Sequence, residues 1–110
     1  MPISDAKVEN ALEILMDREH TAAKARAAHE YISDMDKVVL AKLMTHSDEK
    51  SNAAKETWAR AHPEYEDHLQ QKKALAEMDY TQRDRRAAAA AIIDLYRTEQ
   101  SNARMAGRLQ

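Results

Sequence analysis

The sequence contains no cysteine and no phenylalanine, and its 110 residues include one glycine and two prolines. Without cysteine there are no disulfide bonds, no thiolate metal ligands and no cysteine nucleophile. The single glycine, Gly107, rules out Asn-Gly hairpins and the glycine-rich loops that cradle phosphate groups. These absences argue against a β-rich fold, a disulfide-stabilised secreted domain and a nucleotide-binding loop.

Long apolar runs are also missing. No stretch approaches the roughly 20 apolar residues of a membrane-spanning helix. The first residues lack the basic and then apolar segments of a secretory signal. We therefore expect a soluble cytoplasmic protein that does not span a membrane.

Strong helix formers, above all Ala, Glu, Lys, Arg, Gln, Leu and Met, make up most of the chain. This composition predicts an all-α fold, and the length predicts a single domain over residues 1–110. Bulky apolar side chains are few, so the core is expected to be thin. A partner helix or a second copy of the chain, as in a homodimer, would help to complete it.

Apolar spacing and capping residues predict four helices, over residues 5–16, 17–45, 52–61 and 63–106. Ser4 is a suitable N-cap for the first helix, which is either separate from the second or continuous with it. Pro63 suits the first turn of the last helix, and Gly107 is expected to stop that helix.

The simplest assembly pairs the second and last helices in a long, coiled-coil-like antiparallel hairpin. The first helix and the short helix that carries Trp58 would pack alongside it. In this arrangement Ala22–Ala28 would face the run Ala87–Ala91, so that the two helix axes could approach closely.

Charge is distributed unevenly along the chain. Residues 81–110 hold six arginines against three acidic residues, whereas residues 1–80 hold eleven Lys and Arg against sixteen acidic residues. A basic helix end can bind an acidic protein surface or nucleic-acid phosphates. The alternative is a solvated face whose arginines form local pairs and complement the helix dipole.

No catalytic or metal signature is present. The five histidines form neither an i, i+4 pair nor a His-Glu-x-x-His motif, so no metal and no cofactor are expected. Thr45–Asp48 contains residue types of a nucleophilic triad, but these neighbours lie on the predicted chain reversal and are typical of helix capping. We expect a protein that is not an enzyme.

The last third of the chain carries a resemblance. The alanine-rich helix from Arg86 ends with Tyr96-Arg97, which is followed by Ser101-Asn102 and Arg104. This end resembles a group of small, all-helical proteins of tailed bacteriophages and prophages. Such proteins are often encoded near phage genes for recombination and replication, so the resemblance implies an accessory role in DNA metabolism or in handling host factors, inside a bacterial host cell. The group provides no activity that can be carried over to this chain.

The leading hypothesis is therefore a non-enzymatic helical adaptor that binds a protein partner through its basic end. The candidate partner-binding residues are Arg83, Arg86, Tyr96, Arg97, Ser101, Asn102, Arg104 and Arg108. One alternative is direct nucleic-acid binding by the five arginines of this set. Another is inhibition of a bacterial defence nuclease.

Overall fold

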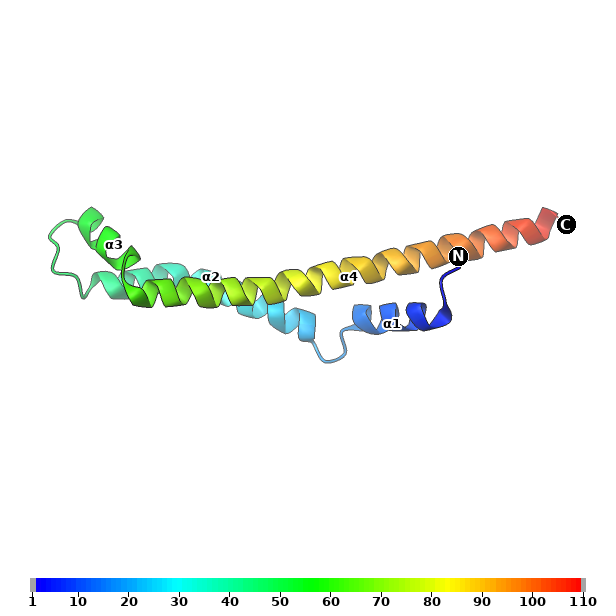
Figure 1. Ribbon diagram of the computed structural model, residues 1–110, viewed down its shortest axis with the longest axis horizontal. Coiled ribbons are helices and arrows are strands. Elements are labelled where there is room, and N and C mark those ends of the chain that lie inside the picture. Colours follow the sequence, from blue (N-terminus) through cyan, green and yellow to red (C-terminus); the bar gives the residue numbers. More distant parts are fainter. Residues whose placement is uncertain (1, 110) are drawn as a thin grey trace. The chain divides into compact units, whose positions relative to one another are not determined.

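The computed structural model describes residues 2–109, and within them it contains four helices and no strand (Figure 1). The helices are α1 (Asp5–Met16), α2 (Thr21–Met44), α3 (Asn52–Arg60) and α4 (Pro63–Leu109). The predicted all-α fold is confirmed, with the expected order of two short and two long helices. None of the helices in residues 2–109 is both long enough and apolar enough to cross a membrane.

The contacts divide the chain into two compact units. Unit 1 combines the chain up to Ala23 with the chain from Tyr80 onward, so it contains α1 and the second part of α4. Unit 2 is Lys24–Asp79 and contains most of α2, all of α3 and the first part of α4.

Capping residues explain where α1 and α2 begin and end. The Ser4 hydroxyl accepts a hydrogen bond from the Lys7 N–H at 3.3 Å, which opens α1. Asp17 then adopts the left-handed region, with φ 47° and ψ 49°, and ends the helix. Its carboxylate accepts the N–H groups of Ala22 and Ala23 in the first turn of α2, at 3.1 and 3.2 Å. Asp17 therefore ends α1 and caps the start of α2, and residues 17–20 separate the two helices.

The predicted stop at Gly107 is wrong, because α4 continues to Leu109 and Gly107 lies inside the helix. No glycine has a positive φ. A glycine ends a helix only when it takes the left-handed conformation, which Gly107 does not.

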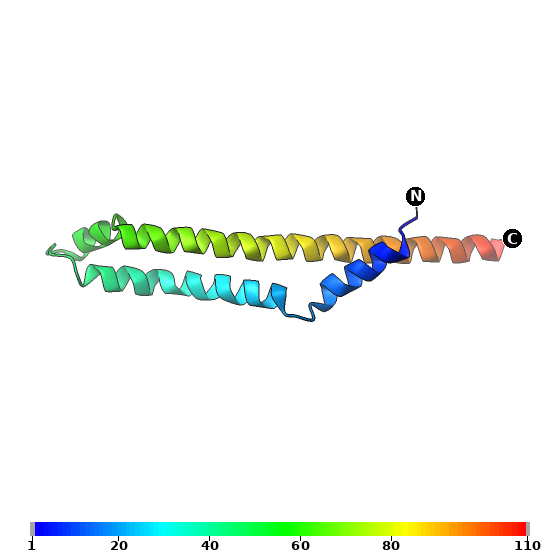
Figure 2. The ribbon, with the colours of Figure 1, turned by 60° about the horizontal axis from the view of Figure 1, so that its bottom comes forward.

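Unit 2 is a helical hairpin. α2 and the first part of α4 run antiparallel, with α3 at the turn between them (Figures 1 and 2). Leu43, Ala59 and Tyr65 are buried together at this turn, and Trp58 packs against them. Ala59 is completely buried, so only a small side chain fits there. The predicted hairpin and the predicted place of Trp58 are confirmed.

In unit 1, α1 lies antiparallel to the alanine-rich part of α4 (Figures 1 and 2). Ala11 of α1 and Ala89 of α4 are both about 1 % exposed, and the other four alanines of the run Ala87–Ala91 are exposed. The predicted pairing of this run with Ala22–Ala28 is wrong, because the run packs against α1 instead. The chain break at Asp17 separates α1 from α2 and allows α1 to pack there.

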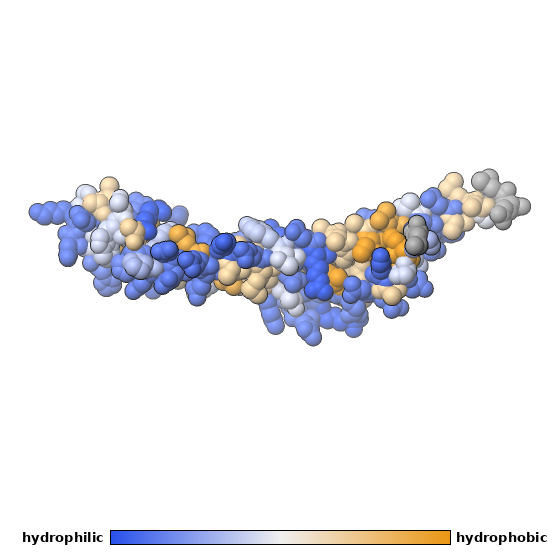
Figure 3. Space-filling model, viewed as in Figure 1, coloured by the Kyte–Doolittle hydropathy of each residue, from blue (hydrophilic) through white to orange (hydrophobic). Residues whose placement is uncertain are grey.

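Two helices cannot enclose a core, and unit 1 accordingly keeps apolar side chains at its surface. Apolar residues gather over α1 and the adjoining part of α4 on the face shown in Figure 3. Leu12, Met16 and Leu95 are each between 42 and 58 % exposed. Unit 1 therefore depends on specific tethers between its helices as well as on apolar burial.

The hairpin turn offers a direct test of the fold. Leu43→Ala removes the largest aliphatic side chain of the cluster and should lower the free energy of unfolding by about 2–5 kcal/mol. Urea denaturation followed by circular dichroism measures this change. Leu12→Ala, at an exposed position of α1, is the control and should change it by less than about 1 kcal/mol. Equal losses for the two variants would contradict the assigned core.

Candidate functional site

The inward face of α4 follows a seven-residue repeat that includes charged side chains. Residues of this face recur at alternating steps of three and four, as expected for a coiled-coil seam. The buried or half-buried positions in this repeat are Tyr65, His68, Lys72, Leu75, Asp79, Gln82, Arg86, Ala89, Ile93 and Tyr96, and three positions beside it, Ala76, Ile92 and Glu99, are also half-buried. Charged side chains thus occupy three successive equivalent positions: Lys72, Asp79 and Arg86. Each meets an opposite charge or a polar group.

Lys72 shares its partner with a histidine in unit 2. The Asp36 carboxylate of α2 lies 2.6 Å from Nζ of Lys72 and 2.6 Å from Nε2 of His68. Burial alone would raise the pKa of Asp36, but the hydrogen bonds from Lys72 and His68 lower it below its ordinary value. Asp36 is therefore held as a carboxylate between two donors.

Asp79 forms the second polar pair of the hairpin. Its Oδ2 atom lies 2.8 Å from Nδ1 of His29, and the residue is only about 1 % exposed. His29 and Asp36 are seven residues apart in α2, as Lys72 and Asp79 are in α4. Complementary groups at matching intervals favour one alignment of the two helices, because a shift by one residue would leave polar groups buried without partners.

Arg86 ties α1 to α4 in unit 1. One of its terminal nitrogens donates to the carbonyl oxygens of Ile14 and Leu15, at 3.1 and 3.3 Å. These carbonyls belong to the last turn of α1, which contains no basic residue of its own. The guanidinium therefore supplies both donors and positive charge where a helix end carries partial negative charge.

Glu99 holds the opposite end of α1. Its carboxylate oxygens accept the Ile3 N–H at 3.3 and 3.1 Å. Arg86 and Glu99 thus contact α1 near its two ends, and Ala89 is buried between them in sequence. The antiparallel alignment of α1 on α4 is set by these two polar contacts.

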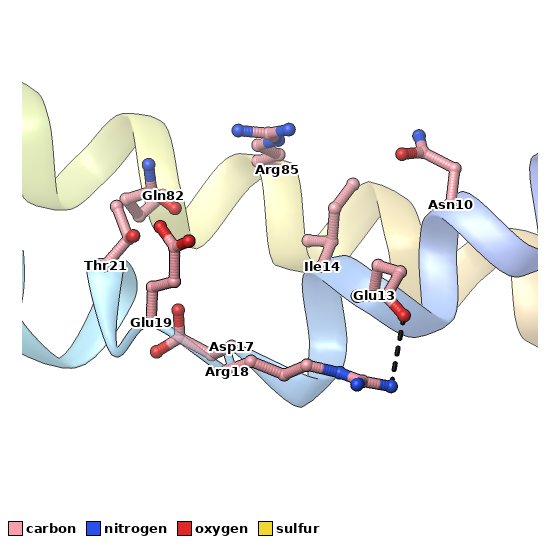
Figure 4. Close-up of a pocket in the computed structure, with 9 residues that line it drawn as sticks. All are labelled: Asn10, Glu13, Ile14, Asp17, Arg18, Glu19, Thr21, Gln82 and Arg85. Carbon is pink, nitrogen blue, oxygen red and sulfur yellow. Dashed lines mark ion pairs between the residues drawn. The ribbon is translucent and has the colours of Figure 1, made fainter.

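A shallow pocket of about 300 Å³ lies beside the end of α1 (Figure 4). Its rim includes Glu13, which pairs with Arg18 at 3.2 Å, and Arg85 of α4. Asp17 also lines it, and the N–H of Ala22 is the main cause that lowers the pKa of this carboxylate. Charges of both signs line the pocket. Nowhere in residues 2–109 do three His, Asp or Glu side chains come together to hold a metal ion.

The strongest candidate for a binding surface is the segment Arg97–Arg108 of α4, which we call the distal segment. Every residue in it except Glu99 is exposed. Arg97, Ser101, Arg104 and Arg108 follow one another at steps of four, three and four, so they lie on one helical face. Asn102 is exposed beside that face.

The other predicted site residues lie elsewhere. Arg86 is half-buried against α1, and Tyr96 is half-buried on the inward face of α4. Arg83 is exposed, with its guanidinium 5.8 Å from the centre of the Tyr80 ring. Arg83 is 14 residues before Arg97, or about 21 Å along the helix axis at roughly 1.5 Å per residue. The distal segment therefore keeps five of the eight predicted residues: Arg97, Ser101, Asn102, Arg104 and Arg108.

The polar pairs of the hairpin were not predicted from the sequence. His29 and His68 carry no metal-site motif, and Asp79 is a charged residue that apolar spacing does not identify as inward-facing. The available signal was the seven-residue spacing of Lys72, Asp79 and Arg86 between Tyr65 and Ile93.

Comparison of the chain with protein-family models, with curated proteins and with solved structures finds no match.

His29 and Asp79 should be energetically coupled, so the effect of replacing one on the free energy of unfolding should depend on whether the other is present. Asp79→Leu leaves the imidazole facing an apolar side chain and should lower the free energy of unfolding by about 1–3 kcal/mol. Adding His29→Leu should recover most of this loss, because two apolar groups can replace a buried pair. A double-mutant cycle by urea denaturation measures the coupling. Additive losses would show that the two residues act independently.

Arg86 and Arg104 form a matched pair for testing the attachment of α1. Arg86→Ala should raise amide hydrogen exchange throughout Asp5–Met16, because the carbonyls of Ile14 and Leu15 lose their donor. Arg104→Ala removes the same charge from an exposed position of α4 beyond the Ile3–Glu99 contact and should leave this exchange unchanged. Similar exchange in both variants would mean that Arg86 does not hold α1.

Proposed function

We propose that this chain is a non-enzymatic helical adaptor, which binds a protein partner through the distal segment of α4. One observation carries the proposal. All nine residues from Gln100 to Arg108 are exposed, yet they remain helical. A short helix without packed neighbours is marginal in water, so a surface that covers it would stabilise it.

The chemistry of the segment favours a protein over a small molecule. It offers three arginines on one convex helical face, with Ser101 among them. Guanidinium groups bind carboxylates through two parallel hydrogen bonds, which gives both affinity and orientation. The half-buried contact between Arg86 and α1 and the bond between Glu99 and Ile3 hold the preceding part of α4 against α1.

Nucleic-acid binding is the second candidate function, because the same arginines could contact phosphates. Tyr96 is half-buried on the inward face, so its ring is only partly open to base stacking, and the distal segment contains no aromatic residue. Binding by the distal segment would therefore rest on phosphate contacts, would show little sequence preference and would weaken steeply with salt.

A biological setting for the adaptor comes from the resemblance of its end to phage and prophage proteins. In that setting the partner would belong to phage recombination or replication, or would be a host defence nuclease that the adaptor inhibits. The resemblance rests on Tyr96-Arg97, Ser101-Asn102 and Arg104. Both arginines, Arg97 and Arg104, are exposed and therefore suitable for contact.

A variant pair separates the two candidate functions. The test variant is Arg97→Ala with Arg104→Ala, and the control is Arg26→Ala with Lys37→Ala, which removes two exposed cations from α2. A partner recovered with the wild-type chain should also be recovered with the control and be lost with the test variant. Purified partner and chain should then reproduce this difference by calorimetry, with a loss of about tenfold or more in affinity.

The same three proteins should be titrated with labelled duplex and single-stranded DNA. Binding at about 50 mM salt that weakens about fortyfold by about 200 mM, as three phosphate contacts would give, and that is lost in the test variant, would favour the nucleic-acid function. Equal recovery of the protein partner by the test and control variants would contradict the adaptor proposal.

A further inference from the structure

The inward face of α4 continues beyond the reach of α1. The three- and four-residue steps that include Ile93 and Tyr96 lead on to Gln100, Ala103 and Gly107, which we call the distal seam. Ile93 and Tyr96 are half-buried, whereas all three residues of the distal seam are exposed. The N-terminal tether of α1 is the bond between Ile3 and Glu99. The distal seam therefore extends an existing helix–helix interface without a covering helix.

Gly107 gives an independent reason to regard this face as a contact surface. It has no positive φ, and a Cβ atom added there would have no neighbour within 4 Å. Alanine would therefore fit and would favour the helix, since glycine is unfavourable inside one. This glycine therefore does not help the isolated helix to form. It would allow a second helix to approach closely, because the small residues Ala103 and Gly107 lie one turn apart on the same face.

The edge of the distal seam determines the charge of its occupant. Arg97, Arg104 and Arg108 lie along one edge, and the carboxylate of Glu99 is already bonded to Ile3. A second copy packed antiparallel on the same face would bring these arginines against one another, which is unfavourable. A helix with Asp or Glu along the matching edge would pair with them.

We infer that the distal seam receives an acidic helix of a protein partner, packed closely against Ala103 and Gly107 in continuation of α1. The inference rests on the proposed adaptor function and specifies its partner. Small seam residues set the distance between the helices, and the arginine edge selects the charge and orientation of the partner.

A designed peptide is the probe for this inference. It is an amphipathic helix of about three heptads, with leucine at its seam positions and glutamate along its edges, and the control peptide carries lysine in place of glutamate. Fluorescence anisotropy measures the affinity of each labelled peptide for the full chain. The glutamate peptide should bind the wild-type chain, and the lysine peptide should bind at least tenfold more weakly. Arg97→Glu with Arg104→Glu should reverse this preference, because two glutamates then outweigh the remaining Arg108 on this edge.

Gly107→Ala distinguishes a contact surface from a merely exposed helix end. In the free chain it should raise the helix content measured by circular dichroism, because alanine is the better helix former. It should nevertheless lower the affinity for the glutamate peptide severalfold, and Ala103→Leu should lower this affinity about tenfold, because both substitutions add bulk between the helices. Ala91→Leu is the matched control at an exposed alanine two residues from both Ala89 and Ile93, and it should leave the affinity unchanged.

The outcomes separate this inference from the adaptor function. If Gly107→Ala and Ala103→Leu bind the glutamate peptide as tightly as the wild type, the close helix contact is wrong, even when the arginine variants still lose the protein partner. Equal affinity for the two peptides would overturn the acidic character of the occupant. Concentration-dependent dimers that Ala103→Leu abolishes in sedimentation would assign the distal seam to a second copy and would also overturn the inference. If the arginine variants still bind both the glutamate peptide and the protein partner, both proposals are wrong.

Discussion

The structure depends on charged side chains of α4 that must find partners on its inward face. Lys72 needs the Asp36 carboxylate, Asp79 needs His29, and Arg86 needs the last carbonyls of α1. A thin core with many alanines fixes helix alignment weakly, because alanines in one helix can face several alternatives in another. Polar pairs at seven-residue intervals remove that freedom, since a shifted alignment leaves a buried charge without its partner. They specify the arrangement more than they stabilise it.

Asp17 is a further polar residue that determines the arrangement, because it sets where the chain leaves α1 and enters α2. Its left-handed backbone ends α1, and its carboxylate binds the first N–H groups of α2. An apolar residue could do neither, because the left-handed conformation and the capping bond both favour Asp or Asn. The break allows α1 to run antiparallel to α4 in unit 1, where Arg86 and Glu99 receive its two ends. Three polar residues thus place a helix that buries few of its own apolar groups.

The sequence allowed the four helices and the starts of α1, α3 and α4 to be predicted, because capping is local: Ser4 and Pro63 act within one turn of where they stand. The second helix was expected from residue 17, but α2 begins at Thr21, because Asp17 and His20 take the left-handed conformation. The inward face of α4 was harder to predict. Leu69 and Tyr80 are the residue types expected inside, yet their side chains are 43 and 52 % exposed, while their polar neighbours His68 and Asp79 are buried. A buried polar residue becomes favourable only through a partner distant in sequence, so local patterns cannot identify it. The prediction that Gly107 ends α4 was wrong because the presence of a glycine does not by itself determine its backbone angle φ, which also depends on the surrounding structure.

The arginines of α4 show why net charge alone does not locate a binding surface. The excess of arginine after residue 80 suggests one basic surface, but Arg86 is bound to the carbonyls of α1 and Glu99 is bound to Ile3. Both charges are therefore already used in holding unit 1 together. Arg97, Arg104 and Arg108 are exposed, and they line the part of the seam that α1 leaves uncovered. Arginine thus holds the fold together where α1 covers α4, and it is available to a partner where α1 does not cover α4. The N-terminal end of α1 therefore determines where on α4 a partner can begin to bind.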